Sequence, residues 1–156
     1  MLTLTIICFA LCCRNLREAR NVSKNFSKEY TGLDTLIKLD GYYYYEDSTE
    51  LCFPLVFSKN SEFKTLFSRF KTHEELQNII RRSEIGNYGT YTLVGNIINV
   101  KWASRYNPGC YEIFSEQYVI ENDTTLRLIW HLCETCETYS TKRDPIRNDI
   151  YKFFKY

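Results

Sequence analysis

Apolar and polar residues alternate along most of the chain after about residue 40, which is the pattern of strands that bury one face. The clearest instance surrounds Gly95-Asn96, a dipeptide that stands between two such runs and predicts a hairpin with a two-residue loop. On the strand that follows the loop, Ile98, Val100 and Trp102 share one face. We therefore expect this hairpin to contribute one face to a hydrophobic core.

Four consecutive tyrosines, Tyr42 to Tyr45, predict an earlier strand behind an Asp-Gly turn signal. Because neighbouring side chains in a strand point to opposite faces, Tyr42 and Tyr44 share one face and Tyr43 and Tyr45 share the other. We expect a first barrel strand with two rings inward and two on the outer surface.

Further strands are predicted by apolar and aromatic runs that end at turn signals. In the run TLRLIWHL the three leucines are in step with Trp130, so we expect the leucines and Trp130 to share one face. The predicted runs cover residues 51–57, 63–70, 110–120, 125–132 and 150–156.

One short helix is predicted over residues 73–82. Thr72 and Glu75 have the spacing of a capping box at its start. A one-sided apolar stripe gives it a face to bury, and the stripe consists of Leu76, Ile79 and Ile80. We expect this helix to cover one mouth or side of a sheet.

These elements amount to about seven or eight strands with one short helix and no alternation of strands and helices. The fold class predicted for residues 33–156 is all-β, an antiparallel lipocalin-like barrel or a sandwich. A composition of 13 Tyr, 10 Phe and 2 Trp among 156 residues favours β structure in the same way. The length suits a single domain.

The first residues differ from the rest of the chain. Residues 1–13 contain an apolar run that is too short to span a bilayer as a helix and is typical of the hydrophobic region of a signal peptide, although no Lys or Arg precedes it. Residues 14–32 are polar and mildly basic and are interpreted as a tether. The alternative is that the apolar run is a buried element of a cytoplasmic protein.

A cysteine directly after the apolar run, at Cys12 or Cys13, resembles the lipidation site of a bacterial lipoprotein signal. With the tether, LDGYYYY, and the segment GNYGTYTLVGNIINVKW, the chain is similar over about residues 39–132 to small, largely uncharacterised bacterial lipoproteins with a lipocalin-like barrel. The resemblance implies a membrane anchor through an N-terminal lipid and supplies no catalytic residues. The matching positions are Gly89, Tyr91, Leu93, Gly95, Asn96, Ile98, Asp123 and Leu126.

Charge and motifs narrow the function classes. The net charge is +1, from 20 basic and 19 acidic residues, so nucleic-acid binding has no support. The chain has no phosphate-binding glycine loop, and its two histidines, His73 and His131, stand in no evident catalytic triad. We therefore expect no enzyme activity and no cofactor.

The segment HLCETC offers a weak alternative. His131, Cys133 and Cys136 are three possible metal ligands, but structural zinc normally takes four, and a redox motif needs a strand–helix–strand setting that is absent from the pattern. In an exported protein a disulfide is an option, between Cys133 and Cys136 or with Cys52 or Cys110. The alternative is that these cysteines are unpaired thiols in a strand and a loop.

Aromatic residues make the remaining case for a binding site. Rings with a polar tip suit small apolar, sugar or peptide ligands, and they are also ordinary barrel core. The candidates for lining a barrel interior or cleft are Tyr42, Tyr44, Tyr91, Trp102 and Trp130, with Tyr111 and Tyr118 beside them.

The preferred hypothesis is an exported, lipid-anchored cell-envelope protein, on the periplasmic side or the outer surface, that acts as a binding or interaction module. A cytoplasmic β-rich protein with a Cys/His metal or redox site is one alternative, and an envelope hydrolase is another. An envelope hydrolase would lose turnover on His131→Ala.

Overall fold

The computed structural model describes residues 18, 21–22, 30–47, 50–66, 68–82, 86–107, 110–135 and 146–156. The strands are β1 (Gly41–Asp47), β2 (Glu50–Phe57), β3 (Glu62–Thr65), β4 (Arg69–Phe70), β5 (Asn87–Val94), β6 (Ile97–Asn107), β7 (Cys110–Asn122), β8 (Thr125–Cys133) and β9 (Ile146–Lys155). A short 3-10 turn, η1 (Leu33–Thr35), precedes β1, and the helix α2 (His73–Arg81) lies between β4 and β5.

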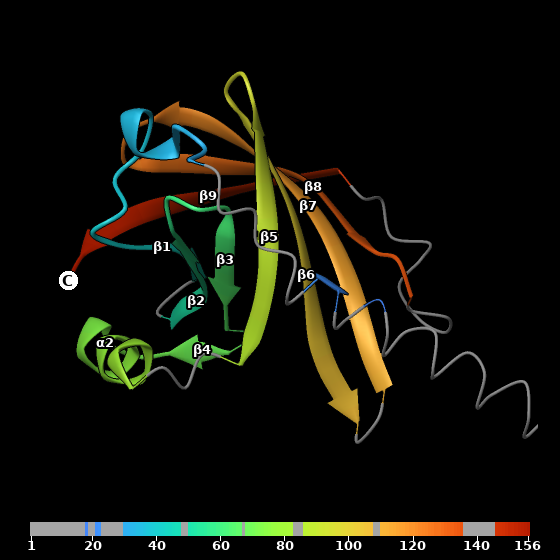
Figure 1. Ribbon diagram of the computed structural model, residues 1–156. Helices are drawn as coiled ribbons and strands as arrows, with labels where there is room; N and C mark the ends of the chain where they lie inside the picture. The colour runs from blue at the N-terminus through green and yellow to red at the C-terminus, as the bar shows by residue number, and fades with distance from the viewer. Residues whose placement is uncertain are drawn as a thin grey trace, which may run out of the picture.

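Eight strands form a closed antiparallel barrel (Figure 1). The sheet order is β1-β9-β8-β7-β6-β5-β3-β2-β4, and β2 pairs back to β1. The strand β4 is the extra one, and it pairs with β2 beyond the segment that pairs with β3. The predicted lipocalin-like antiparallel barrel with one short helix is therefore confirmed.

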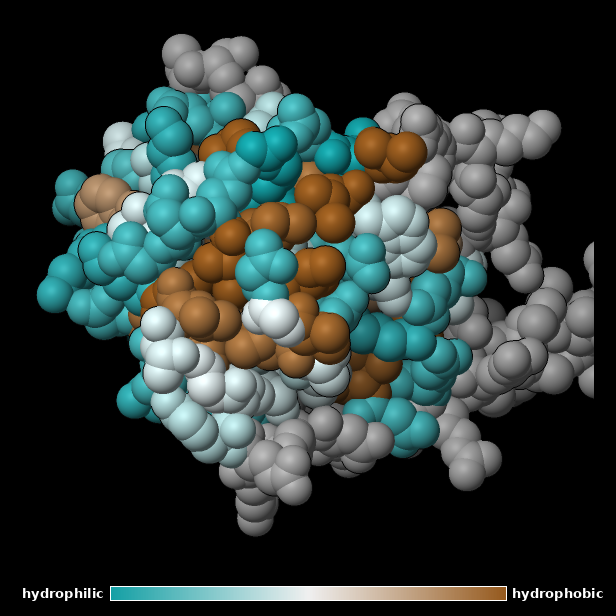
Figure 2. All heavy atoms as spheres, turned by 90° about the horizontal axis from the view of Figure 1, so that it is seen from above, coloured by the Kyte–Doolittle hydropathy of each residue, from teal (hydrophilic) through white to brown (hydrophobic). Residues whose placement is uncertain are grey.

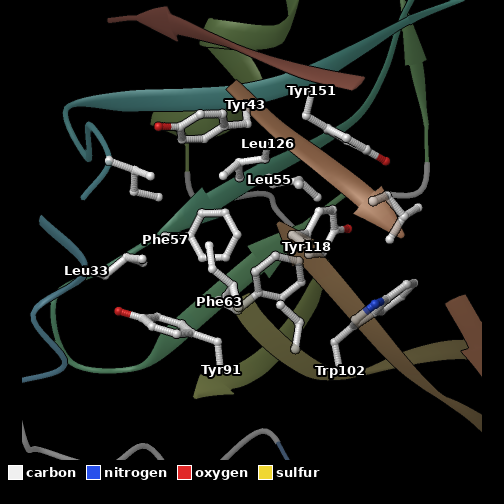
Figure 3. Packing of buried hydrophobic residues seen from close by; sticks show 14 of the residues in the cluster. Leu33, Tyr43, Leu55, Phe57, Phe63, Tyr91, Trp102, Tyr118, Leu126 and Tyr151 are labelled. Carbon is white, nitrogen blue, oxygen red and sulfur yellow. The ribbon is translucent and has the colours of Figure 1, made fainter. Parts of the chain in front are cut away.

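The barrel interior is filled by side chains from every part of the wall. Tyr43 of β1, Phe57 of β2 and Phe63 of β3 are almost fully buried in one cluster with Trp102 of β6 and Tyr151 of β9. Figure 3 shows these rings lying across the barrel from one another, with Tyr91, Tyr118 and Leu126 packed between the same strands. An eight-stranded barrel has an interior that side chains can fill, and this one does so mainly with aromatic rings.

A second cluster lies outside the barrel. The helix α2 packs over the outer face of β1, β2 and β4 through Leu76, which is fully buried (Figure 1). Its N-terminus is capped as predicted, because the Thr72 hydroxyl accepts from the Glu75 N–H at 3.2 Å. The strand and helix residues of this helix-covered face are Tyr42, Tyr44, Leu51, Val56, Phe70, Leu76, Ile79, Ile80 and Phe154.

The four tyrosines divide between these two clusters. Tyr43 is in the interior cluster with Tyr45 packed against it, whereas Tyr42 and Tyr44 belong to the helix-covered face. The expectation of two rings on each face is met, but Tyr42 and Tyr44 do not line the barrel interior. Both faces of β1 are apolar because a helix covers the outer one, so alternation alone does not say which pair points inward.

A β-bulge changes the facing of β8. Its register against β7 shifts between Leu128 and Trp130, where Leu128 pairs with Tyr118 but Trp130 pairs with Gln117. The predicted common face of the leucines and Trp130 is therefore wrong: Leu126 and Leu128 point inward, and Trp130 points outward. One extra residue in a strand reverses every later side chain.

Two glycines hold the wall in shape. Gly95 has φ 62° as the first central residue of the β5–β6 loop, which is the conformation that a two-residue hairpin favours for glycine. At Gly89 a Cβ atom would lie 2.3 Å from the carbonyl oxygen of Lys101 and 2.5 Å from Cβ of Trp102. Strand β6 therefore approaches β5 closely at that point.

Some boundaries differ from those predicted. The run 63–70 forms two short strands, β3 and β4, instead of one. Strand β3 pairs with residues 55–57 of β2, and β4 pairs with residues 51–52 in a register shifted by one residue. The strand predicted at 150–156 begins earlier, at Ile146, and the helix ends at Arg81. The leader 1–13 lies outside the described residues, as does most of the tether 14–32.

Candidate functional site

An open groove of about 320 Å³ lies on the outer wall formed by β5, β6, β7 and β8. This volume is at the lower end for sites that bind small molecules. Outward side chains dominate its lining, and Tyr91, Val100 and Glu116 border it from residues whose side chains point inward. The outward residues of the groove are Thr90, Thr92, Asn99, Lys101, Ser115, Gln117 and Trp130.

Strand register brings these side chains together. Thr92 pairs with Asn99, Asn99 with Gln117, and Gln117 with Trp130, so four neighbouring strands contribute one row. Within this row the Gln117 amide Nε2 donates to Asn99 Oδ1 at 2.9 Å. The bulge in β8 is what places Trp130 at the end of the row. The arrangement combines one aromatic ring with side-chain amides and a hydroxyl.

Lys101 is the charged residue among the outward side chains that line the groove. Its Nζ lies 2.7 Å from Glu134 Oε2 and 3.2 Å from Glu18 Oε1. Partial burial lowers the pKa of the Lys101 ammonium, but the hydrogen bonds to Glu134 and Glu18 outweigh burial and raise the pKa above its ordinary value. Ser115 donates to the other oxygen of Glu134. Lys101 is thus held as a cation at the edge of the groove.

An apolar row lies beside the groove, one step further along the same strands. Val94 pairs with Ile97, Ile97 with Val119, and Val119 with Arg127, which in turn pairs with Ile150. Val94 is 66% exposed, and Ile146, opposite Trp130, is 71% exposed. Figure 2 looks down on the barrel end where the β5–β6 hairpin turns and shows a broad hydrophobic area there. We call Val94, Ile97, Val119 and Ile150 the apolar row; Arg127, which is ion-paired with Glu121, interrupts it between Val119 and Ile150.

His131, Glu116 and Tyr118 form a chain of polar groups at the barrel interior. His131 Nδ1 lies 2.8 Å from Glu116 Oε1, and the Tyr118 hydroxyl donates to Glu116 Oε2 at 2.7 Å. Burial and the nearby Glu116 raise the pKa of Tyr118 well above its ordinary value. A carboxylate in a core needs such partners, so these hydrogen bonds have a sufficient structural role. A hydrolytic site needs a nucleophile within reach of the His131 imidazole. The hydrogen bond described for His131 instead joins it to the carboxyl group of Glu116.

Tyr42 and Tyr44 attach the helix. The Tyr42 hydroxyl and His73 Nδ1 are 2.7 Å apart, and the Tyr44 ring meets the His73 ring edge-on with centroids 4.9 Å apart. The other side of His73 stacks on Phe154 at 3.7 Å. Burial lowers the pKa of His73, and the charge of Glu46 opposes this in part. The first turn of α2 is therefore fixed to β1 and β9 by an aromatic cluster.

The cysteines are only partly described. Cys133 is disulfide-bonded, and Cys52 is a buried thiol, so Cys52 is not the partner of Cys133. Cys136 lies outside the described residues, and the disulfide at Cys133 would have to be reduced before its sulfur could bind a metal as a thiolate. Within the described part of the chain no group of three or more His, Cys, Asp or Glu side chains is placed to hold a metal ion.

The five aromatic residues predicted to bind a ligand do not form one site. Tyr91 and Trp102 lie in the barrel interior, and Tyr42 and Tyr44 lie under the helix. Only Trp130 combines an outward position with a place in the groove. Sequence reasoning missed Asn99, Gln117 and Lys101 as site residues, although the alternation of the β6 hairpin already indicated that Asn99 and Lys101 face outward.

The candidate lipidation sites Cys12 and Cys13 lie outside the described residues. Among the helices that are described, none has the length and hydrophobicity to span a bilayer. No protein-family model, curated protein or solved structure matches the chain. The groove and its surroundings therefore have to be interpreted from their own chemistry.

Proposed function

We propose that the protein is an exported, lipid-anchored cell-envelope protein that acts as a binding module, with its ligand site in the outer groove. The observation that carries the proposal is the groove itself, where Trp130 stands in one row with Gln117, Asn99 and Thr92. The barrel interior is a poor alternative, because aromatic side chains already fill it.

The chemistry of the groove suits a sugar. A Trp ring offers a flat apolar surface for the carbon face of a pyranose, and amides and hydroxyls satisfy its hydroxyl groups. The Gln117 amide and Asn99 are already oriented by their mutual hydrogen bond at 2.9 Å. A short peptide or small apolar ligand would use the same ring and leave more of the polar groups without a role.

Two features support export. Disulfides persist in oxidising compartments, and Cys133 is disulfide-bonded. The apolar leader followed by Cys12 and Cys13 has the order of a lipoprotein signal.

Anchoring is tested by labelling cells with radioactive palmitate and separating their membranes, using the native chain and a Cys12→Ala/Cys13→Ala double variant. We expect label in the membrane fraction that disappears in the variant. An unlabelled soluble protein that retains Met1 would contradict the anchor.

The ligand is tested by titrating chito-, cello- and malto-oligosaccharides in a calorimeter, which needs no tryptophan as reporter. We expect one series to bind, and Trp130→Ala to weaken that binding by tenfold or more, on the order of 1.4 kcal/mol. The exposed-residue variant Val94→Ala is the matched control and should bind as the native chain does. Binding that survives Trp130→Ala unchanged would place the ligand elsewhere.

A further inference from the structure

The turn between β7 and β8 carries the sequence Asn122-Asp123-Thr124, in which an asparagine is followed two residues later by a hydroxyl side chain. An Asn-X-Ser/Thr sequence whose middle residue is not proline is the acceptor motif for N-linked glycans in exported proteins. A three-residue motif is common, so its place in the fold decides whether it has a use.

Asn122 lies on the surface of the folded barrel. It is the last residue of β7 and is exposed, as are its neighbours Glu121 and Asp123. A glycan is bulky and hydrated, so the residue that carries it has to face solvent. An attached sugar at Asn122 therefore fits the fold without displacing a strand.

The two side chains that define the motif are in contact. Thr124 Oγ1 donates to Asn122 Oδ1 at 2.9 Å, and the Thr124 backbone N–H donates to the same oxygen at 3.0 Å. An asparagine that accepts from the backbone two residues further on forms an Asx-turn. Both contacts use the amide oxygen, so the amide nitrogen Nδ2 takes no part in them. The hydroxyl of the motif thus orients the amide that would be modified.

The rest of the chain holds this turn in place. The Asp123 carbonyl oxygen accepts from the Lys38 N–H at 3.0 Å and from the Tyr43 hydroxyl at 2.9 Å. The Thr124 carbonyl oxygen accepts from the Phe153 N–H at 2.9 Å. In Figure 1 the β7–β8 turn accordingly lies beside η1 at one end of the barrel. These bonds engage the backbone and leave the Asn122 side chain on the outside.

Two other acceptor motifs occur near the start of the chain, Asn21-Val22-Ser23 and Asn25-Phe26-Ser27. In the first, Asn21 and Val22 are helical and Val22 is only 8% exposed, which differs from the exposed turn at Asn122. The second lies outside the described residues. Asn122 is therefore the acceptor that the structure supports.

We propose that Asn122 carries an N-linked glycan. The donor is an oligosaccharide joined through pyrophosphate to a membrane lipid, and a membrane-bound glycosyltransferase of the exporting cell catalyses the transfer. A bond forms between Nδ2 of Asn122 and the anomeric carbon of the first sugar, and the bond between that carbon and the phosphate oxygen breaks. The lipid pyrophosphate leaves with the bonding electrons, and Nδ2 loses one proton. The inference rests on the export part of the proposed function and does not depend on the lipid anchor.

The test expresses the full chain in cultured insect cells, which transfer N-linked glycans to exported proteins. Two forms are compared, the chain alone and the chain with an established cleavable signal peptide fused ahead of Met1. A peptide N-glycosidase releases N-linked glycans and converts the carrier asparagine to aspartate. Digestion in heavy-oxygen water marks that aspartate, and peptide mass spectrometry then identifies the position.

We expect most of the translocated chain to carry a glycan at Asn122. Asn122→Gln and Thr124→Ala should both abolish it, whereas Thr124→Ser keeps the hydroxyl and should retain it. Asn96 is the matched control, because it is exposed in the neighbouring β5–β6 hairpin loop but is followed two residues later by Ile98. Asn96→Gln should leave the glycan pattern unchanged.

The two forms separate failure of the inference from failure of export. A glycan at Asn122 on both forms supports both. A glycan only on the form with the added signal peptide supports the inference and contradicts export through residues 1–13. A translocated chain whose Asn122 is unmodified, or whose glycan is confined to Asn21 or Asn25, would overturn the inference and leave export standing.

Discussion

Two stretches of the barrel's outer wall carry large apolar side chains, and they differ in what covers them. On β1, β2 and β9 the helix α2 lies over Tyr42 and its neighbours and buries them. On β5 to β9 the apolar row keeps Val94 66% exposed. Both stretches have the composition of a surface that avoids water. The helix of the same chain covers the first surface, whereas Val94 on the second surface remains open to an outside partner.

The largest difference is expected between Leu76 and Val94, one residue from each surface. Leu76→Ala empties a fully buried position and should lower the free energy of unfolding by about 2–5 kcal/mol. Val94→Ala, at a residue 66% exposed, should change it by about 0.5 kcal/mol or less. Urea denaturation followed by circular dichroism measures both. Equal losses would mean that the apolar row is covered in the free protein, and the contrast would be lost.

The wall under the groove has to keep its shape without a covering helix, and a smaller loss of stability is expected when β5 and β6 are forced apart there. Gly89→Ala would bring a Cβ atom to 2.3 Å from the Lys101 carbonyl oxygen, so β5 and β6 would separate and the protein should lose about 1–3 kcal/mol. At Gly86 an added Cβ has no neighbour within 4 Å, so Gly86→Ala is the matched control. Thermal unfolding should show a clear drop in Tm for the first variant alone. An unchanged Tm in Gly89→Ala would show that β5 and β6 can move apart there without loss of stability.

A smaller effect is expected where the helix is joined to β1. Tyr42→Phe removes the hydroxyl that lies 2.7 Å from His73 Nδ1 and should cost about 0.5–1.5 kcal/mol. Tyr44→Phe should cost less, because Tyr44 meets His73 through its ring. Denaturation curves of the two variants sharpen the comparison by showing how much of the helix cover depends on one polar contact. A larger loss of stability in Tyr44→Phe than in Tyr42→Phe would show that the Tyr42 hydroxyl is not the main polar contact between β1 and the helix.

The smallest effect is a dependence on pH at the same joint. Because the pKa of His73 is lower in the folded protein than its ordinary value of about 6.5, protonation favours the unfolded chain. The stabilisation is fully present above about pH 6.5 and should be lost as the pH falls through the folded pKa. Unfolding free energies measured from about pH 7.5 down to 5.5 should decline less in His73→Phe, which keeps the ring stack on Phe154. Identical slopes would show that His73 does not titrate with unfolding.

Much of the fold could be predicted from local patterns. The Gly95-Asn96 hairpin, the Thr72 cap and the antiparallel all-β class depend on neighbouring residues, and each is confirmed. The inward set Ile98, Val100 and Trp102 was also predicted correctly, because β6 runs through it without a bulge.

The candidate site was harder to predict, for two physical reasons. The facing of Tyr42 depends on α2, which comes from a distant part of the chain and makes the outer face of β1 as apolar as the inner one. The facing of Trp130 depends on the bulge in β8, and an inserted residue leaves the surrounding alternation looking regular. The groove depends on the second of these, because the bulge places Trp130 beside Gln117, and the other outward residues of the groove are individually ordinary.

The pairing of β1 has a consequence for the order of events in a cell. One edge of β1 pairs with β2, its near neighbour in sequence, but the other edge pairs with β9, from Gly41 against Lys155 onward. While the chain is being synthesised, β1 and β8 must wait with open edges until residues 146–155 emerge. Such edges attract other strands. The seam at β9 therefore makes barrel closure the final step of production, and the step at which a chaperone has most to protect.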